Sequence, residues 1–147
     1  MSKPNPAAMG AFSAEVPHRY TAAPDRVFRA WTDPASIKAW LAGGERAIAD
    51  VRVDGLYNVE MAHEGRNYPH YGRYLRVEPP RVLEFTWVSE GTHGKESVVT
   101  ITLTPSGDGG TELLLRHAGL PSPESAESHR GGWTGFAERL VARLAAA

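Results

Sequence analysis

The sequence contains no cysteine, which excludes disulfide bonds, thiolate metal sites and cysteine nucleophiles together. It has no apolar stretch near the roughly 20 residues that a membrane-spanning helix requires, and its N-terminus has no apolar run suited to a signal peptide. Neither sign of charge dominates, because 16 Lys and Arg stand against 17 Asp and Glu. Without a basic stripe, neither nucleic acid nor an anionic membrane is an expected partner. We therefore expect a soluble, cytoplasmic protein.

Common catalytic and metal-binding motifs are missing too. The six histidines show no HExxH or similar ligand spacing, and no GxSxG elbow or Ser-x-x-Lys motif is present. The strand positions that we expect to face inward carry no pair of carboxylates for glycosidase chemistry. We expect no bound metal and no cofactor, and no catalytic motif assigns an enzyme class.

What the sequence does contain is typical of one globular domain. It has 147 residues, of which 41% are apolar and 22% are charged. Residues 1–11 are rich in proline, alanine and small polar groups, which predicts a mobile tail. Residues 12–147 show no internal repeat and predict a single α+β domain.

The segment after residue 23 predicts two short helices. Pro24 suits a first helical position, because the N–H that proline lacks would have no partner there. The pair Asp33-Pro34 ends this helix and begins the second one. Trp31 and Trp40 lie on the apolar faces of the two helices.

Alternation with a period of two predicts that the rest of the chain forms an antiparallel sheet. A first strand is expected at 12–21, where Pro17 indicates an edge position or a bulge. Short turn-like connections then favour hairpins between successive strands. These later strands are expected at 46–53, 55–63, 68–78, 81–90, 96–105 and 110–118.

The alternation also predicts which face of the sheet is covered. Leu83, Phe85 and Trp87 point one way, while Glu84 and Thr86 point the other. Later strands repeat the pattern with threonine and glutamate on the outer side. One face is therefore expected to be apolar and covered, and the other polar.

A long C-terminal helix is the expected cover. Ser122 is a typical N-cap, and an apolar stripe with helical spacing follows, from Trp133 to Leu144. Gly131 and Gly132 should weaken the middle of this helix by about 1 kcal/mol each relative to alanine. Their presence indicates either a close approach of the sheet or a bend in the helix.

Six segments in this order resemble the activator-of-Hsp90-ATPase-like branch of the START/Bet v 1-like superfamily. They are VFRAWTDPASIKAWL (27–41), DVRVDGLY (50–57), GRYLRVEPPRVLEFTW (72–87), SVVTITLTP (97–105), GTELLLRHAGL (110–120) and HRGGWTGFAERLVARL (129–144). The resemblance implies the helix-grip fold, in which a curved antiparallel sheet of six to seven strands wraps around the long C-terminal helix. Trp40-Leu41 and Asp54-Gly55 depart from a double tryptophan and a double glycine that are frequent in the family.

The alternation and the resemblance together predict a cavity between the sheet and the C-terminal helix. A mostly apolar lining with a few polar groups is typical of small-molecule sites. The expected lining residues are Trp31, Trp40, Tyr57, Val59, Met61, Tyr71, Arg73, Leu75, Phe85, Trp87, Ile101, Leu115, His117, His129, Trp133, Phe136 and Leu140.

The polar members of this set have structural alternatives. His117 is equally consistent with a neutral core histidine bonded to a carbonyl or hydroxyl group. Arg73 either needs a buried partner or lies in water at the open end of the barrel. His129 can pair with His117 or with an acid of its own helix.

Three functions remain open on these residues. The first is the binding of a small apolar molecule, such as a lipid, an aromatic or a polyketide-like compound, by a monomer or homodimer. The second is a cyclase or hydrolase that uses His117 or His129 as a general base. The third, implied by the family name, is a chaperone-associated interaction with a protein partner, which an exposed apolar patch on the outer face would favour.

Overall fold

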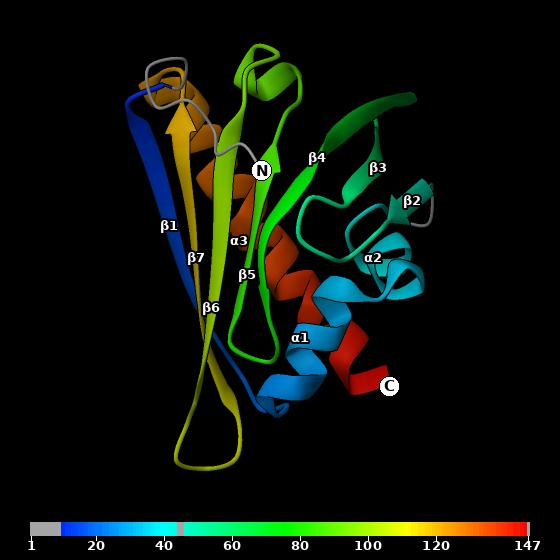
Figure 1. Ribbon diagram of the computed structural model, residues 1–147, viewed down its shortest axis with the longest axis vertical. Helices are drawn as coiled ribbons and strands as arrows, with labels where there is room; N and C mark the ends of the chain where they lie inside the picture. Colours follow the sequence, from blue (N-terminus) through cyan, green and yellow to red (C-terminus); the bar gives the residue numbers. More distant parts are fainter. Residues whose placement is uncertain (1–9, 44–45, 147) are drawn as a thin grey trace.

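The computed structural model describes residues 10–43 and 46–146, so most of the expected tail at 1–11 lies outside the described residues. Strands and helices follow one another in nearly the predicted order (Figure 1). The elements are β1 (Phe12–Tyr20), α1 (Pro24–Thr32), α2 (Pro34–Trp40), β2 (Arg46–Ala49), β3 (Leu56–His63), β4 (Arg66–Glu78), β5 (Val82–Trp87), the 3-10 turn η2 (Glu90–Thr92), β6 (Ser97–Pro105), β7 (Thr111–Leu120) and α3 (Pro123–Ala146).

The strands form one antiparallel sheet in the order β1-β7-β6-β5-β4-β3-β2. β1 is an edge strand, which explains why Pro17 is tolerated within it. In Figure 1 α3 runs obliquely along one face of the sheet, and α1 and α2 lie beside the C-terminal half of α3. This arrangement confirms the predicted α+β helix-grip fold.

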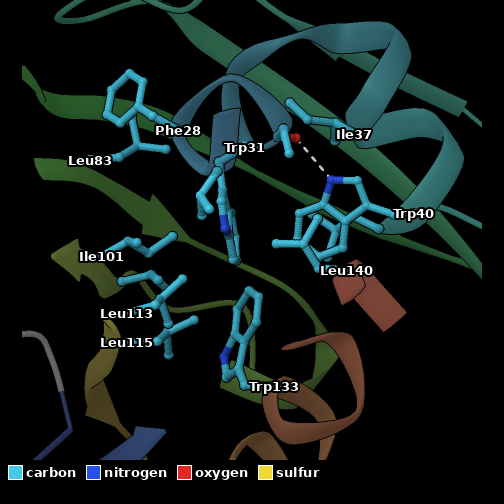
Figure 2. Close-up of a cluster of buried hydrophobic side chains, with 14 of the residues drawn as sticks. Phe28, Trp31, Ile37, Trp40, Leu83, Ile101, Leu113, Leu115, Trp133 and Leu140 are labelled. Carbon is cyan, nitrogen blue, oxygen red and sulfur yellow. Dashed lines mark hydrogen bonds between the residues drawn. The ribbon is translucent and has the colours of Figure 1, made fainter. Parts of the chain in front are cut away.

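The core lies between α3, the two short helices and the inner face of the sheet. Trp133 and Leu140 of α3 are buried against Leu83, Ile101 and Leu115 of the central strands. Figure 2 shows these side chains interlocked in one cluster. Most of the stability that α3 gains comes from this apolar burial, at about 25 cal/mol per Å².

The outer face of the central strands is polar, as the alternation predicts. Glu84 and Thr100 are paired across β5 and β6, and the Thr100 hydroxyl donates a hydrogen bond of 2.7 Å to the Glu84 carboxylate. Arg116 on β7 lies 3.7 Å from the Glu15 carboxylate of β1. Leu114 is an exposed apolar exception on this face.

The prediction for β4 is wrong over most of the strand. Tyr71 is 48% exposed, whereas Tyr74 is 3% exposed and packs in the core. Leu75 is an extra residue in β4, because Tyr74 pairs with Phe85 and the next pair joins positions 76 and 84. Such a bulge reverses the alternation between the two parts of a strand, so Val77 after it packs against the core as strict alternation predicts, whereas Tyr71 before it is exposed. Tyr71, Arg73 and Leu75 therefore do not form the inward row that strict alternation gives them.

The structure contradicts one of the two interpretations of the glycine pair in α3, a close approach of the sheet. The helix runs without interruption from Pro123, and the Ser122 hydroxyl accepts the Ser125 N–H at 3.0 Å as the predicted cap. A Cβ atom added at Gly131 or Gly132 would meet nothing within 4 Å. The sheet therefore does not approach the helix closely at these glycines.

Candidate functional site: a cleft between α2, the β3–β4 hairpin and α3

The interior that was expected to hold a ligand is filled with side chains. Most of the predicted lining residues are at most 6% exposed and contact one another; they are Trp31, Trp40, Tyr57, Val59, Phe85, Trp87, Ile101, Leu115, His117, Trp133 and Leu140. The rings of Trp87 and Trp133 lie 4.8 Å apart, and those of Trp31 and Trp40 lie 4.7 Å apart. The Trp40 indole N–H donates to the Ala30 carbonyl at 2.8 Å (Figure 2). These residues build the wall behind the site instead of lining it.

An open cleft of about 680 Å³ lies beside this core. Four parts of the chain meet around it: the end of α2, the β3–β4 hairpin, the turn that follows β5, and one side of α3. Its walls are Ala39, Leu41, Ala42, Gly43, Met61, Ala62, His63, Tyr68, His70, Ser89, Glu90, Gly91, Ser128, Gly132, Phe136 and Arg139. Of the predicted lining residues, Met61 and Phe136 lie on this wall.

Gly132 shapes the helical wall of the cleft. It lies on the cleft surface, and the space where its Cβ would stand is open. Any larger residue here would project a side chain into the cleft, since side chains of a helix point outward from its axis. Phe136, one turn further on, is partly buried and supplies the apolar surface beside this bare position.

His70 brings a polar ring to the cleft wall. Its Nδ1–H donates to the carbonyl of Tyr68 at 2.9 Å, and its ring lies 4.8 Å from that of Trp87. Burial lowers the pKa of His70, and His129 lowers it further, while the carbonyls of Tyr68 and Val59 oppose the change. His70 is therefore a neutral polar group at neutral pH.

His129 lies directly behind the cleft wall, against Gly91. Its Nδ1–H donates to the Ser125 carbonyl at 2.7 Å, and the Ser125 hydroxyl donates to the Gly91 carbonyl at 2.7 Å. Burial lowers the pKa of His129, and the bond to Ser125 opposes this only in part. Because Nδ1 carries the proton, it cannot accept one from the Ser125 hydroxyl 3.4 Å away. These two residues do not form an activated serine nucleophile.

His117 lies deeper and has both ring nitrogens occupied. Nδ1 accepts the indole N–H of Trp133 at 2.9 Å, so Nε2 carries the proton and donates to the Ser97 hydroxyl at 2.7 Å. Ser97 in turn donates to the Trp87 carbonyl at 2.7 Å. Burial lowers the pKa of His117 well below its usual range. His117 therefore matches the structural alternative, a neutral core histidine bonded to a hydroxyl group.

Arg139 is the cation of the cleft wall. Its guanidinium donates to the Trp40 carbonyl at 3.0 Å and lies over the Phe136 ring, 5.1 Å from the centroid. The carboxylate of Glu90 on the opposite wall is ion-paired with Arg66. Arg139 therefore offers positive charge next to an apolar surface.

The polar half of this wall, His70 and Arg139, is not among the residues predicted from the sequence. His70 is on the inner face because of the bulge at Leu75, and a bulge has no distinct signal in this segment. Arg139 follows Phe136 by three residues, a spacing that places both on one helix side. This spacing is the one signal in the sequence that could have placed Arg139 beside Phe136. Arg73, by contrast, lies 3.6 Å from Glu96 and is absent from the cleft wall.

Comparison with known families assigns the chain. The model of the family described as activator of Hsp90 ATPase homolog 1-like protein matches residues 21–145. The chain belongs to this family. The matched range includes every residue that lines the cleft.

Solved structures similar to this chain come from several organisms. CalU16 from Micromonospora echinospora is 33% identical, with a TM-score of 0.72 over 90% of this chain and 75% of that one. Protein CV1439 from Chromobacterium violaceum is 27% identical, with a TM-score of 0.78 over 90% and 96%. PFC0360w, an HSP90 activator from Plasmodium falciparum, is 22% identical with a TM-score of 0.77 over 92% and 97%, and shares the fold. Comparison with curated protein sequences finds no significant match.

Two further findings concern residues 10–43 and 46–146 only. Among them, no group of three or more His, Cys, Asp or Glu side chains is placed to hold a metal ion. No helix within these ranges is long and apolar enough to cross a membrane.

Proposed function

We propose that the protein binds a small amphipathic molecule in the cleft between α2, the β3–β4 hairpin and α3. The observation that carries this proposal is the size and lining of the cleft. Its volume of about 680 Å³ falls within the range of roughly 300–1,000 Å³ that small-molecule pockets occupy. Three other hollows of the described surface measure about 210, 330 and 490 Å³.

The lining favours a ligand with an apolar body and an anionic or hydrogen-bond-accepting end. Met61, Leu41 and Phe136 would cover the apolar body, and burial would contribute about 25 cal/mol per Å² before ordering costs. Arg139 would face a carboxylate, sulfonate or phenolate group. The neutral ring of His70 adds a polar contact without repelling an anion.

The fluorescent probe 1-anilinonaphthalene-8-sulfonate tests this proposal, because it joins aromatic rings to a sulfonate. We expect saturable fluorescence enhancement with one probe per chain. Gly132→Leu should abolish it by filling the cleft. Gly131→Leu is the matched control, since position 131 also has open space around it but is not on the cleft wall. Both variants add the same helix-favouring residue, so their folding should be equal.

Equal probe binding by the two leucine variants would contradict the proposal. Native mass spectrometry of the purified protein provides a second readout, because a co-purifying compound would appear as a mass increment. That increment should persist in Gly131→Leu and disappear in Gly132→Leu. Its retention in both variants would place the compound elsewhere.

One observation favours a second candidate function, the binding of a protein partner. Ile48, Asn58 and Tyr71 are neighbours across β2, β3 and β4 and share the outer face of the sheet with Leu56. The three apolar members of this group are exposed. An apolar patch on a surface often marks an interface. The family description and the Plasmodium falciparum neighbour suggest an Hsp90-type chaperone as the partner.

Stimulation of a purified Hsp90 ATPase by this protein tests the second candidate. We expect the rate to rise with the wild-type protein and to return to the basal level with Leu56→Glu. Leu114→Glu is the control, because Leu114 is an exposed leucine on the outer face of a distant strand. An unchanged ATPase rate with the wild-type protein would count against this partner.

A further inference from the structure

A second hollow, about one helical turn from the cleft along α2 and α3, is lined by arginines. It measures about 210 Å³ and lies where α1, the start of α2 and the end of α3 meet. Its walls are Arg26, Arg29, Ala30, Asp33, Ser36, Arg143 and Leu144. None of these residues belongs to the cleft of the proposed function.

The charge in this hollow is opposite to that of the chain. Three arginines and one aspartate give its wall a formal charge of +2, whereas the whole chain carries −1. Asp25, outside the wall, lies 3.9 Å from Arg29, and both side chains are well exposed. Such an exposed pair neutralises little of the local field.

Two of the three guanidinium groups are held in place by the surrounding backbone and side chains. Arg26 donates to the Leu144 carbonyl at 2.5 Å, and Arg143 donates through Nε to the Ser36 hydroxyl at 3.3 Å. Each of these bonds uses one of the five N–H donors of a guanidinium. The other donors remain for a ligand, and the side chains have already lost much of their freedom.

Helix capping explains only part of this cluster. Arg26 satisfies a carbonyl of the last turn of α3, which a cation at that end stabilises. Arg29 has no such role, because its side chain is 70% exposed and its partner at 3.9 Å is weak. Like charges this close together repel one another, and an anion between them would relieve that repulsion.

We propose that this hollow binds a small tetrahedral oxyanion, namely a phosphate group, either free or carried by a small phosphorylated compound. Planar guanidinium groups bind phosphate oxygens in pairs, which makes arginine the preferred residue for such sites. The hollow of about 210 Å³ exceeds the roughly 30 Å³ of a water molecule several-fold and is smaller than a drug-sized pocket. This volume accommodates a phosphate group and leaves room for a small body attached to it.

Nuclear magnetic resonance of the arginine Nε–H groups tests the proposal, with sodium phosphate as the probe and sodium chloride at equal ionic strength as the reference. We expect saturable shifts for Arg29 and Arg143 that chloride does not produce. Arg116, on the outer face of β7, should not shift. Equal shifts at all arginines, or none that saturates, would overturn the site.

Four variants sharpen the result. Arg29→Gln and Arg143→Gln should each weaken phosphate binding by about tenfold or more, the value of one charge-assisted hydrogen bond. Arg116→Gln removes the same charge elsewhere and should leave the affinity unchanged. Asp33→Asn should tighten binding, because it removes the carboxylate of the wall and its side chain makes no capping bond. Equal losses of phosphate affinity in Arg29→Gln, Arg143→Gln and the control Arg116→Gln would indicate only a general effect of net charge and would overturn the site.

The source of the phosphate group follows from a comparison of ligands. Tighter binding of glycerol phosphate than of inorganic phosphate would assign the site to a phosphorylated compound, and the reverse to the free ion. Acetate should bind more weakly than either. A preference for acetate would overturn the tetrahedral-oxyanion assignment.

Discussion

The indole N–H of Trp133 donates a hydrogen bond to Nδ1 of His117 across 2.9 Å, and this contact determines the tautomer of the histidine. With Nδ1 acting as acceptor, the proton must lie on Nε2, from which it is donated to Ser97. The chain of bonds ends at the carbonyl of Trp87. It links α3 to β7, β6 and β5 inside an otherwise apolar core.

Ser97→Ala should break this chain with little change in volume. It would leave the His117 Nε2–H and the Trp87 carbonyl unsatisfied in the core, so we expect the free energy of unfolding to fall by about 1–3 kcal/mol. Urea denaturation measures the loss. Ser13→Ala, at an exposed position in β1, should change the free energy by less than about 0.5 kcal/mol. Equal effects would mean that the chain of bonds contributes no net stability.

Stability should decrease as the pH falls below the ordinary histidine pKa. Burial lowers the pKa of His117 well below 6.5 in the folded protein, and His129 lowers it further. Below pH 6.5 the unfolded chain therefore binds a proton that the folded chain does not. The free energy of unfolding should drop by up to about 1.4 kcal/mol per pH unit for this residue alone. His70 and His129, whose pKa values burial also lowers, change the stability in the same direction.

Urea denaturation at several pH values between neutral and mildly acid conditions checks this dependence. His117→Asn should be less stable than the wild type at neutral pH, with a shallower dependence below pH 6.5. The nitrogen chemical shifts of His117 give an independent readout, since they report the Nε2–H tautomer directly. A flat stability profile, or a charged His117 in the folded protein, would refute the argument.

Much of the fold follows from local sequence signals. Pro24, Asp33-Pro34 and Ser122 mark helix starts that the structure reproduces, because a missing donor or a capping oxygen acts over a few residues only. The alternation in β5, Leu83, Phe85 and Trp87, is confirmed for the same reason. Such signals need no knowledge of the rest of the chain.

The candidate site could be predicted only in part, because it depends on how well the core closes. Whether large side chains leave a cavity or fill it is decided by packing among segments far apart in sequence. Trp31, Trp87 and Trp133 fill the interior, and the open volume lies beside them, at Met61 and Phe136. Amino-acid type alone does not distinguish these two outcomes.

The bulge in β4 makes a prediction that separates the observed orientation from strict alternation. Tyr74→Ala should cost about 3–5 kcal/mol, as deletion of a buried aromatic ring does, because Tyr74 is buried against Tyr57 and Phe85. Tyr71→Ala should cost less than about 0.5 kcal/mol, because Tyr71 is on the outer face. Thermal or urea denaturation of the two variants compares them. A larger loss of stability in Tyr71→Ala than in Tyr74→Ala would support strict alternation and contradict the bulge.

The glycines of α3 and β4 should respond in opposite directions to alanine. Gly131 and Gly132 have open space at the Cβ position, so Gly131→Ala and Gly132→Ala should each raise the free energy of unfolding by about 0.5–1 kcal/mol. At Gly72 a Cβ would lie 2.2 Å from the Thr86 carbonyl oxygen. The backbone would have to shift, and we expect Gly72→Ala to cost about 1–3 kcal/mol, the usual penalty of overpacking.

Urea denaturation of the three alanine variants measures both signs in one experiment. A gain at positions 131 and 132 would mean that the helix tolerates residues other than glycine there, and that glycine at 132 costs stability while keeping the cleft open. A loss at both positions would mean that the helix needs glycine for its backbone, and the link between Gly132 and the cleft would then fail. A neutral Gly72→Ala would show that β4 and β5 can separate locally without cost.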